Sequence, residues 1–196
     1  MEDKAQIPTV ILAAGRSSRM GARDKLLEDI DGLPLLRRQV ERALESGLVI
    51  VTLPSADHPR AAVVPARATI VVVAGQMSDS IRAGIAAVPV DAPGVVILPA
   101  DMPDITAADI SAVKAAATDD IAIVRAATQD GKPGHPIYFA RKTFSDFNIL
   151  EGDRGAFRIC ENWPDDTKIV PLNGQRARLD LDTPEDWDRY RNRSRP

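Results

Sequence analysis

The residues that decide the fold are 9–21, TVILAAGRSSRMG, followed four positions later by Lys25. Residues 9–13 are apolar and rich in β-branched side chains, a composition typical of a buried strand in a parallel sheet. The residues after them are small, polar or basic, as in a loop. Ligands of α/β proteins bind beyond the carboxyl ends of parallel strands. The stretch therefore predicts a strand of an α/β sheet that runs into a ligand-binding loop.

Elsewhere in the chain, short apolar runs alternate with helical patterns. Further strands are expected at residues 48–53, 69–73, 95–98, 121–124 and 137–140. Helices are expected at residues 35–44 and 79–88, after the capping residue Thr106, and after Thr183-Pro184. Such alternation predicts a mostly parallel sheet covered by helices. We therefore expect a single-domain α/β protein with a Rossmann-like three-layer fold.

Length and charge narrow the class of protein. The 196 residues predict one domain, 1–196, with a core over about 8–190 and a flexible tail at 191–196. The 25 Lys and Arg against 28 Asp and Glu give a net charge of −3, which argues against nucleic-acid binding through a basic surface. No run approaches the roughly 20 apolar residues of a membrane span. The four arginines of residues 189–196 are interpreted as a fraying, solvated end rather than a basic arm.

Cysteine and histidine usage excludes several kinds of metal site. The one cysteine, Cys160, cannot form a disulfide within the chain or a cysteine-based metal cluster. The two histidines, His58 and His135, are too few for a multi-histidine site. The lone cysteine fits a reducing compartment, and the charged start of the chain lacks the apolar core of a signal peptide. These features predict a cytoplasmic protein.

The loop after the first strand has the composition of a polyanion site. Small residues at 13–15 let a ligand approach the backbone N–H groups, and Arg16, Arg19 and Lys25 supply positive charge. A triphosphate is the simplest ligand of this kind. The loop has neither the Gly-Lys-Ser/Thr ending of a Walker A loop nor the glycine spacing of a dinucleotide fingerprint. A tight turn that happens to carry surface arginines is the alternative interpretation.

The same stretch resembles the L-A-A-G-x-S-x-R-M-G signature, followed by a lysine, of the MobA-like NTP transferase family. The resemblance extends over about Val10 to Asp186 and implies the nucleotide-diphospho-sugar transferase-like form of the fold. It implies that Arg19 and Lys25 are catalytic residues that hold phosphates and stabilise a pentavalent transition state. It also implies a nucleotide-binding loop made of Leu12, Ala13, Ala14, Gly15, Arg16 and Ser17.

Carboxylates for a metal ion follow a later strand and precede the last helix. Asp101 lies in the turn P-A-D-M-P, where it would face the triphosphate and hold Mg²⁺, although a plain turn aspartate is the simpler interpretation. The resemblance favours the metal, because a D-M-P turn is the metal site of molybdenum-cofactor members.

The stretch L-D-L-D-T-P-E-D resembles the family ending I-D-T-P-E-D, and an extended chain puts Asp180 and Asp182 on one side. Either could be a second metal ligand or an acceptor contact. We expect Asp180 to be the ligand and Asp182 to contact the acceptor, with Glu185 and Asp186 stabilising a helix dipole.

Residues 74–84 resemble the family's G-M-S-x-S-L-x-x-G segment, with Gln76 as an extra residue. The resemblance implies that Gly75 leaves room for the base and that Ser80 hydrogen-bonds a pyrimidine. A simple helix cap at Ser78 is the alternative. The A-A-G of the first loop is also that of cytidylyl members, whereas guanylyl members tend to carry A-G-G. We therefore expect CTP rather than GTP.

Two later motifs resemble the CTP:molybdopterin cytidylyltransferase branch of the family. They are K-P-G-H-P at residues 132–136 and E-G-D-R-G at residues 151–155. The resemblance implies that His135 and Arg154 contact the acceptor. A structural histidine, and an arginine that merely pairs with a neighbouring carboxylate, are the alternatives.

These expectations combine into one reaction. A phosphorylated acceptor, by resemblance molybdopterin or the molybdenum cofactor, attacks the α-phosphorus of CTP with Mg²⁺ bound, and pyrophosphate leaves. The product would be handed to a molybdoenzyme or its chaperone. One alternative is nucleotidyl transfer to a sugar, alditol or choline phosphate. Another is a non-catalytic carrier of the molybdenum cofactor, whereas a pyridine-nucleotide oxidoreductase is disfavoured because the dinucleotide fingerprint is missing.

Overall fold

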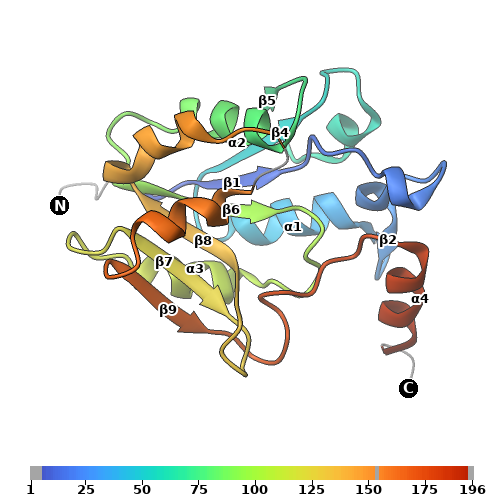
Figure 1. Cartoon of the computed structure of the whole chain (residues 1–196). Helices are drawn as coiled ribbons and strands as arrows, with labels where there is room; N and C mark the ends of the chain where they lie inside the picture. The colour runs from blue at the N-terminus through green and yellow to red at the C-terminus, as the bar shows by residue number, and fades with distance from the viewer. Residues whose placement is uncertain (1–5, 153–154, 194–196) are drawn as a thin grey trace.

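Strand β1 (Thr9–Leu12) lies inside a seven-stranded sheet in the computed structural model, which describes residues 6–152 and 155–193. The order of the strands across the sheet is β5-β4-β1-β6-β8-β7-β9 (Figure 1). The short strands β2 (Asp29–Ile30) and β3 (Leu33–Pro34) form a separate antiparallel pair. The remaining strands are β4 (Val49–Leu53), β5 (Thr69–Val72), β6 (Gly94–Pro99), β7 (Ile123–Ala127), β8 (Pro133–Ala140) and β9 (Thr167–Pro171).

The sheet is mostly parallel, as the sequence predicts. Strands β5, β4, β1 and β6 are parallel to one another, and so is the pair β7–β9. Strand β8 is the exception, because it runs antiparallel to both β6 and β7. The register sets Leu12 beside both Thr52 of β4 and Pro99 of β6. The loops that follow β1 and β6 therefore start side by side at one edge of the sheet.

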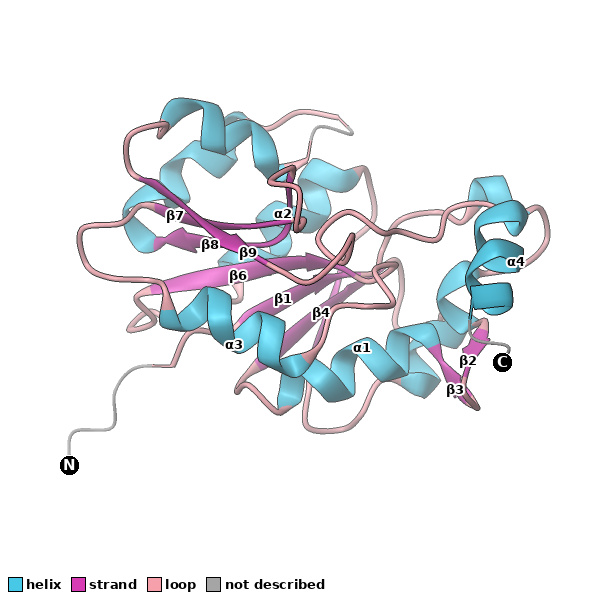
Figure 2. Cartoon of the chain, turned by 90° about the horizontal axis from the view of Figure 1, so that it is seen from below, coloured by secondary structure: helices cyan, strands magenta, loops and turns pink. Residues whose placement is uncertain are grey.

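Helices cover both faces of the sheet and make three layers. Alternate residues of β1 face opposite sides: Ile11 belongs to the cluster that includes residues of α1 and α3, and Val10 to the cluster that includes Ile81 of α2. Figure 2 shows α1 and α3 together along the sheet. The α-helices are α1 (Leu35–Leu44), α2 (Met77–Ala86), α3 (Ala107–Ala115) and α4 (Pro184–Arg193), and the 3₁₀ helices are η1 (Ser18–Met20), η2 (Lys25–Leu27), η3 (Pro59–Val63), η4 (Arg141–Ile149) and η5 (Ala156–Asn162).

Two expectations about element boundaries are wrong. Ser78 does not cap the second helix, because the N–H of Gln76 donates to the Asp79 carboxylate at 2.8 Å and α2 already begins at Met77. Strand β8 begins at Pro133 instead of at residue 137, so most of the K-P-G-H-P motif is strand rather than loop.

Residues 191–193 of the expected tail belong to helix α4 in the structure. Helix α4 continues to Arg193, and the Arg191 guanidinium lies 5.0 Å from the ring centre of Trp187 and 2.8 Å from the Glu28 carboxylate. The first contact lies within the helix, and the contact with Glu28 joins the helix to the segment between η2 and β2. Residues 194–196 lie outside the described part.

A membrane-spanning helix is not found in the described ranges, where every helix is too short or too polar.

Helix α3 offers a test of the capping predicted from the sequence. The Asp109 N–H donates to the Thr106 hydroxyl at 3.2 Å, and the Thr106 N–H donates to the Asp109 carboxylate at 2.9 Å. We expect Thr106→Ala to lower the free energy of unfolding by about 1 kcal/mol, because one N–H loses its acceptor. Urea unfolding measures the change. Ser111→Ala, at an exposed position inside the same helix, is the control and should leave stability unchanged or slightly raised. Equal effects of the two substitutions would contradict the capping role.

Candidate functional site

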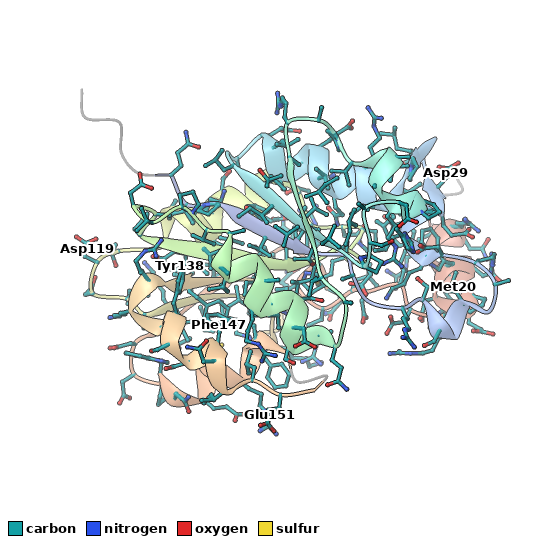
Figure 3. All side chains as sticks on the ribbon, turned by 90° about the horizontal axis from the view of Figure 1, so that it is seen from above. Met20, Asp29, Asp119, Tyr138, Phe147 and Glu151 are labelled. Atoms are coloured by element: carbon teal, nitrogen blue, oxygen red, sulfur yellow. The ribbon has the colours of Figure 1, made fainter. Side chains whose placement is uncertain are left out.

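Three segments far apart in sequence meet at the carboxyl ends of β1 and β6. They are the loop of residues 13–25, the turn at Asp101, and residues 179–183 before α4. The Ala100 N–H donates to the Leu12 carbonyl at 3.2 Å, and the Leu181 N–H donates to the Asp101 carbonyl at 3.0 Å. Figure 3 shows Met20 of the first loop at the same end of the molecule as the C-terminal helix. Backbone hydrogen bonds thus bring all three segments to one place.

Lys25, at the end of the first segment, contacts both other segments through its ammonium group. Its Nζ lies 2.6 Å from an oxygen of Asp101 and 2.6 Å from an oxygen of Asp182. The second oxygen of Asp182 accepts from the Arg19 guanidinium at 2.5 Å. Burial acts to lower the pKa of Lys25, but the charges and hydrogen bonds of Asp101 and Asp182 outweigh it and raise the pKa. The ammonium therefore stays charged between two carboxylates.

Asp180 adds a third carboxylate to this region. Partial burial raises its pKa, and the negative charges of Asp101 and Asp182 raise it further, while Lys25 acts in the opposite direction. Among the described residues Asp180 has no ion-pair partner, whereas Asp182 has both Lys25 and Arg19. The three carboxylates of this region, Asp101, Asp180 and Asp182, therefore outnumber its two cations, Lys25 and Arg19.

The donor set suits a hard divalent cation. Carboxylate oxygens are the protein ligands that Mg²⁺ and Mn²⁺ prefer. Within residues 6–152 and 155–193, three such side chains do not converge with the spacing of a complete metal site. The Lys25 ammonium is instead the cation that Asp101 and Asp182 share. The side chains fit a cation that would need further ligands from substrate or water.

The loop of residues 13–25 is anchored by buried apolar side chains. Met20 within the loop and Leu26 directly after it are both 3 % exposed and belong to the same core cluster. The backbone N–H groups of Ala14, Gly15 and Arg16 find no hydrogen-bond acceptor in the part of the chain that the structure describes. These groups, with the exposed Arg16 side chain, form a surface that attracts an anion.

Arg60 of η3, which the sequence reasoning missed, stabilises this loop through hydrogen bonds. Its side chain is 3 % exposed, and its guanidinium donates to the carbonyls of Ala13 and Gly15. It also donates to the Ser17 hydroxyl at 3.1 Å and to the Asp24 carboxylate at 2.7 and 2.8 Å. The one signal for Arg60 is a single cation within the run P-R-A-A-V-V-P, where a buried arginine requires partners.

The residues expected around the base lie at the start of α2. Gly75 has φ +138°, and a Cβ there would lie 2.2 Å from the Asp79 carboxylate, so a larger residue does not fit. The Ser80 side chain is buried, and its hydroxyl donates to the Gln76 carbonyl at 3.3 Å. Neither residue has a contact with Lys25 or Asp101 in the described structure. Their role in binding a base stays a prediction.

Of the residues expected around the acceptor, Asp182 pairs with Lys25, whereas His135 makes no hydrogen bond to it in the described structure. His135 lies in β8, and its backbone N–H donates to the Ala177 carbonyl at 2.8 Å. Burial, together with the positive charge of Arg125, lowers the pKa of His135 to about 4, so the ring is neutral near pH 7. Asp182 contacts Lys25 and Arg19, as described above. Arg154 lies outside the described residues.

Arg60 yields a prediction for the loop. Arg60→Ala leaves Asp24 and two carbonyls without their buried donor, and we expect the free energy of unfolding to fall by roughly 3–5 kcal/mol. Arg67→Ala, which removes an exposed arginine a few residues away, is the control and should have little effect. Thermal and urea unfolding measure both variants. An Arg60→Ala protein as stable as the Arg67→Ala protein would show that the loop does not depend on this guanidinium.

Comparisons with known proteins agree with this geometry. Residues 9–167 match the MobA-like NTP transferase domain. The crystal structure of Rv0371c from Mycobacterium tuberculosis H37Rv is similar, with 29 % identity and a TM-score of 0.85 over 95 % of this chain and 98 % of that one. Its homologue from Mycobacterium sp. strain JC1 has 28 % identity and a TM-score of 0.81, with 94 % of each chain covered.

A nucleotidyl transferase from Methanothermobacter, Mth528, shares the fold, with 17 % identity and a TM-score of 0.79 over 96 % of this chain and 97 % of that one. No curated protein matches the chain in sequence. The match to the domain spans the first loop, the Asp101 turn and most of the sheet. The chain therefore belongs to the MobA-like NTP transferase family.

Proposed function

We propose that the protein moves the CMP group of CTP to a phosphorylated acceptor and releases pyrophosphate. The observation that carries the proposal is the contact of Lys25 with Asp101 and Asp182, beside a loop with unpaired N–H groups. Such an arrangement matches what nucleotidyl transfer requires, since the reaction depends on positioning and on offsetting negative charge. Membership of a nucleotidyltransferase family supports it.

The first loop would bind the triphosphate. The N–H groups of residues 14–16 would donate to phosphate oxygens, and Arg16, Arg19 and Lys25 would offset their charge. Arg19 is well suited to this role because its side chain is 68 % exposed and a ligand can reach it. Gly75 and Ser80 would then lie on the base side.

Asp101 and Asp180 would hold Mg²⁺. Asp180 is favoured as the second ligand because Lys25 and Arg19 already pair with Asp182. A bound Mg²⁺ would supply charge neutralisation at the phosphates. A manganese complex of the relative Rv0371c, at 27 % identity, supports a divalent cation in this family.

The reaction needs no nucleophile from the protein. An oxygen of the acceptor phosphate forms a bond to the α-phosphorus of CTP, and the bond from that phosphorus to the bridging oxygen of pyrophosphate breaks. Lys25 would stabilise the charge on the α-phosphate after exchanging one of its carboxylate partners for a phosphate oxygen. Its raised pKa keeps it charged for that task.

Molybdopterin, or the molybdenum cofactor, is the proposed acceptor, with delivery of the product to a molybdoenzyme. The proposal draws on the resemblance of the K-P-G-H-P and E-G-D-R-G motifs, which implies acceptor contacts for His135 and Arg154. Asp182, in the L-D-L-D-T-P-E-D stretch, is proposed as a third acceptor contact. A neutral His135 could donate one hydrogen bond to an acceptor without adding charge.

Substitution of the central charges tests the reaction. We expect Lys25→Ala and Asp101→Ala each to lower the rate of pyrophosphate release by about 10²–10³, because each removes a charged contact to the transition state. Lys168→Ala, on the exposed edge strand β9, should keep the normal rate. The assay uses CTP, Mg²⁺ and molybdopterin. Near-normal rates in either site variant would refute these roles, and binding of molybdopterin without pyrophosphate release would favour a carrier.

Nucleotide binding can be measured separately by thermal shift. A ligand that binds only the folded protein at 100 times its Kd adds about 2.7 kcal/mol of stability. With Mg²⁺ present, we expect CTP to raise the Tm more than ATP, GTP or UTP, and we expect EDTA to reduce the shift. A shift with GTP and none with CTP would overturn the proposed base.

A further inference from the structure

A cavity of about 530 Å³ lies beside the candidate site, and nothing above assigns it a role. It is lined by Lys132, Gln175, Arg178, Leu179 and Arg193. Three of these five side chains are cationic and none is acidic. Its volume is in the range of small-molecule sites, roughly 300–1,000 Å³. It is a candidate site for an anion in a chain whose net charge is −3.

The wall of the cavity is fixed by backbone contacts. The turn that carries Gln175 and Arg178 packs on the start of β8, where the His135 N–H donates to the Ala177 carbonyl at 2.8 Å. A Cβ at Gly134 would lie 1.9 Å from that same carbonyl oxygen, so only glycine allows this approach. The K-P-G-H-P motif therefore has a structural task, which is to seat the turn that presents Arg178.

The charges of the cavity are only partly offset. Lys132 lies 2.9 Å from the Asp130 carboxylate and its side chain is 63 % exposed. Arg178 and Arg193 have no carboxylate within 4 Å among the residues that the structure describes. Two guanidinium groups and one ammonium thus face a common space in which a ligand could supply the negative charge.

The cavity adjoins the proposed reaction centre. Leu179 lines it, and two residues later the Leu181 N–H donates to the Asp101 carbonyl. Two extended residues span about 7 Å at most.

We propose that this cavity binds a second negatively charged group of the acceptor. The acceptor would then be a phosphomonoester with a further anionic group, its phosphate at Asp101 and Lys25 and its other charge between Arg178 and Arg193. The identification of the ligand as an acceptor rests on the proposed transfer function. The anion site itself rests on the cavity and its arginines.

Nuclear magnetic resonance titration of the full chain tests the proposal, with 2,3-bisphosphoglycerate and methyl phosphate as probes. We expect 2,3-bisphosphoglycerate to shift the amide signals of Lys132, Gln175 and Arg178, and to bind at least tenfold more tightly than methyl phosphate. The double variant Arg178→Ala/Arg193→Ala should lose these shifts and at least tenfold in affinity. It should keep any shifts at residues 14–16.

The matched control is Arg37→Ala/Arg158→Ala, which removes two exposed arginines away from the cavity and should bind the probe normally. Equal affinity in the two double variants, or no shifts at the cavity, would overturn the proposal. The CTP thermal shift of each variant separates this result from the proposed function. Normal CTP binding without probe binding contradicts the anion site alone, whereas probe binding without any CTP response contradicts the transfer reaction and the acceptor assignment.

Discussion

The buried guanidinium of Arg60 is the group on which the geometry of the first loop depends. A loop that must offer its N–H groups to a ligand has to place its carbonyls elsewhere, and Arg60 takes those of Ala13 and Gly15. The same guanidinium pairs with Asp24, directly before Lys25, and so positions both ends of the loop. Because a buried arginine is costly without partners, its contacts are kept or lost together.

Lys25 couples the loop to the rest of the site. Its ammonium pairs with both Asp101 and Asp182 and so links three distant segments. The proposed substrates would bring both a cation for the carboxylates and an anion for the lysine, so that Lys25, Asp101 and Asp182 could exchange partners without leaving a charge unpaired.

The sequence predicts well what depends on local pattern. The period of the apolar residues and the Thr106 cap yielded the sheet and α3, and the small residues around Gly15 marked the loop. Prediction from the sequence failed for features that are determined by contacts between residues distant in the sequence. The direction of β8 depends on its partners β6 and β7, and the burial of Arg60 depends on carbonyls more than 40 residues away. The contact of Arg191 with Glu28 likewise joins residues 163 positions apart in the sequence.

The reversed strand β8 has a consequence for how such a protein could change its specificity. Since β8 runs antiparallel to β6, the hairpin that leads into it lies at the same edge as the loops after β1 and β6. Its length and sequence can vary without any change in the parallel strands that carry the triphosphate loop. In the proposed reaction, recognition of the acceptor would thereby be uncoupled from recognition of CTP, and grafting this hairpin between relatives would exchange one without disturbing the other.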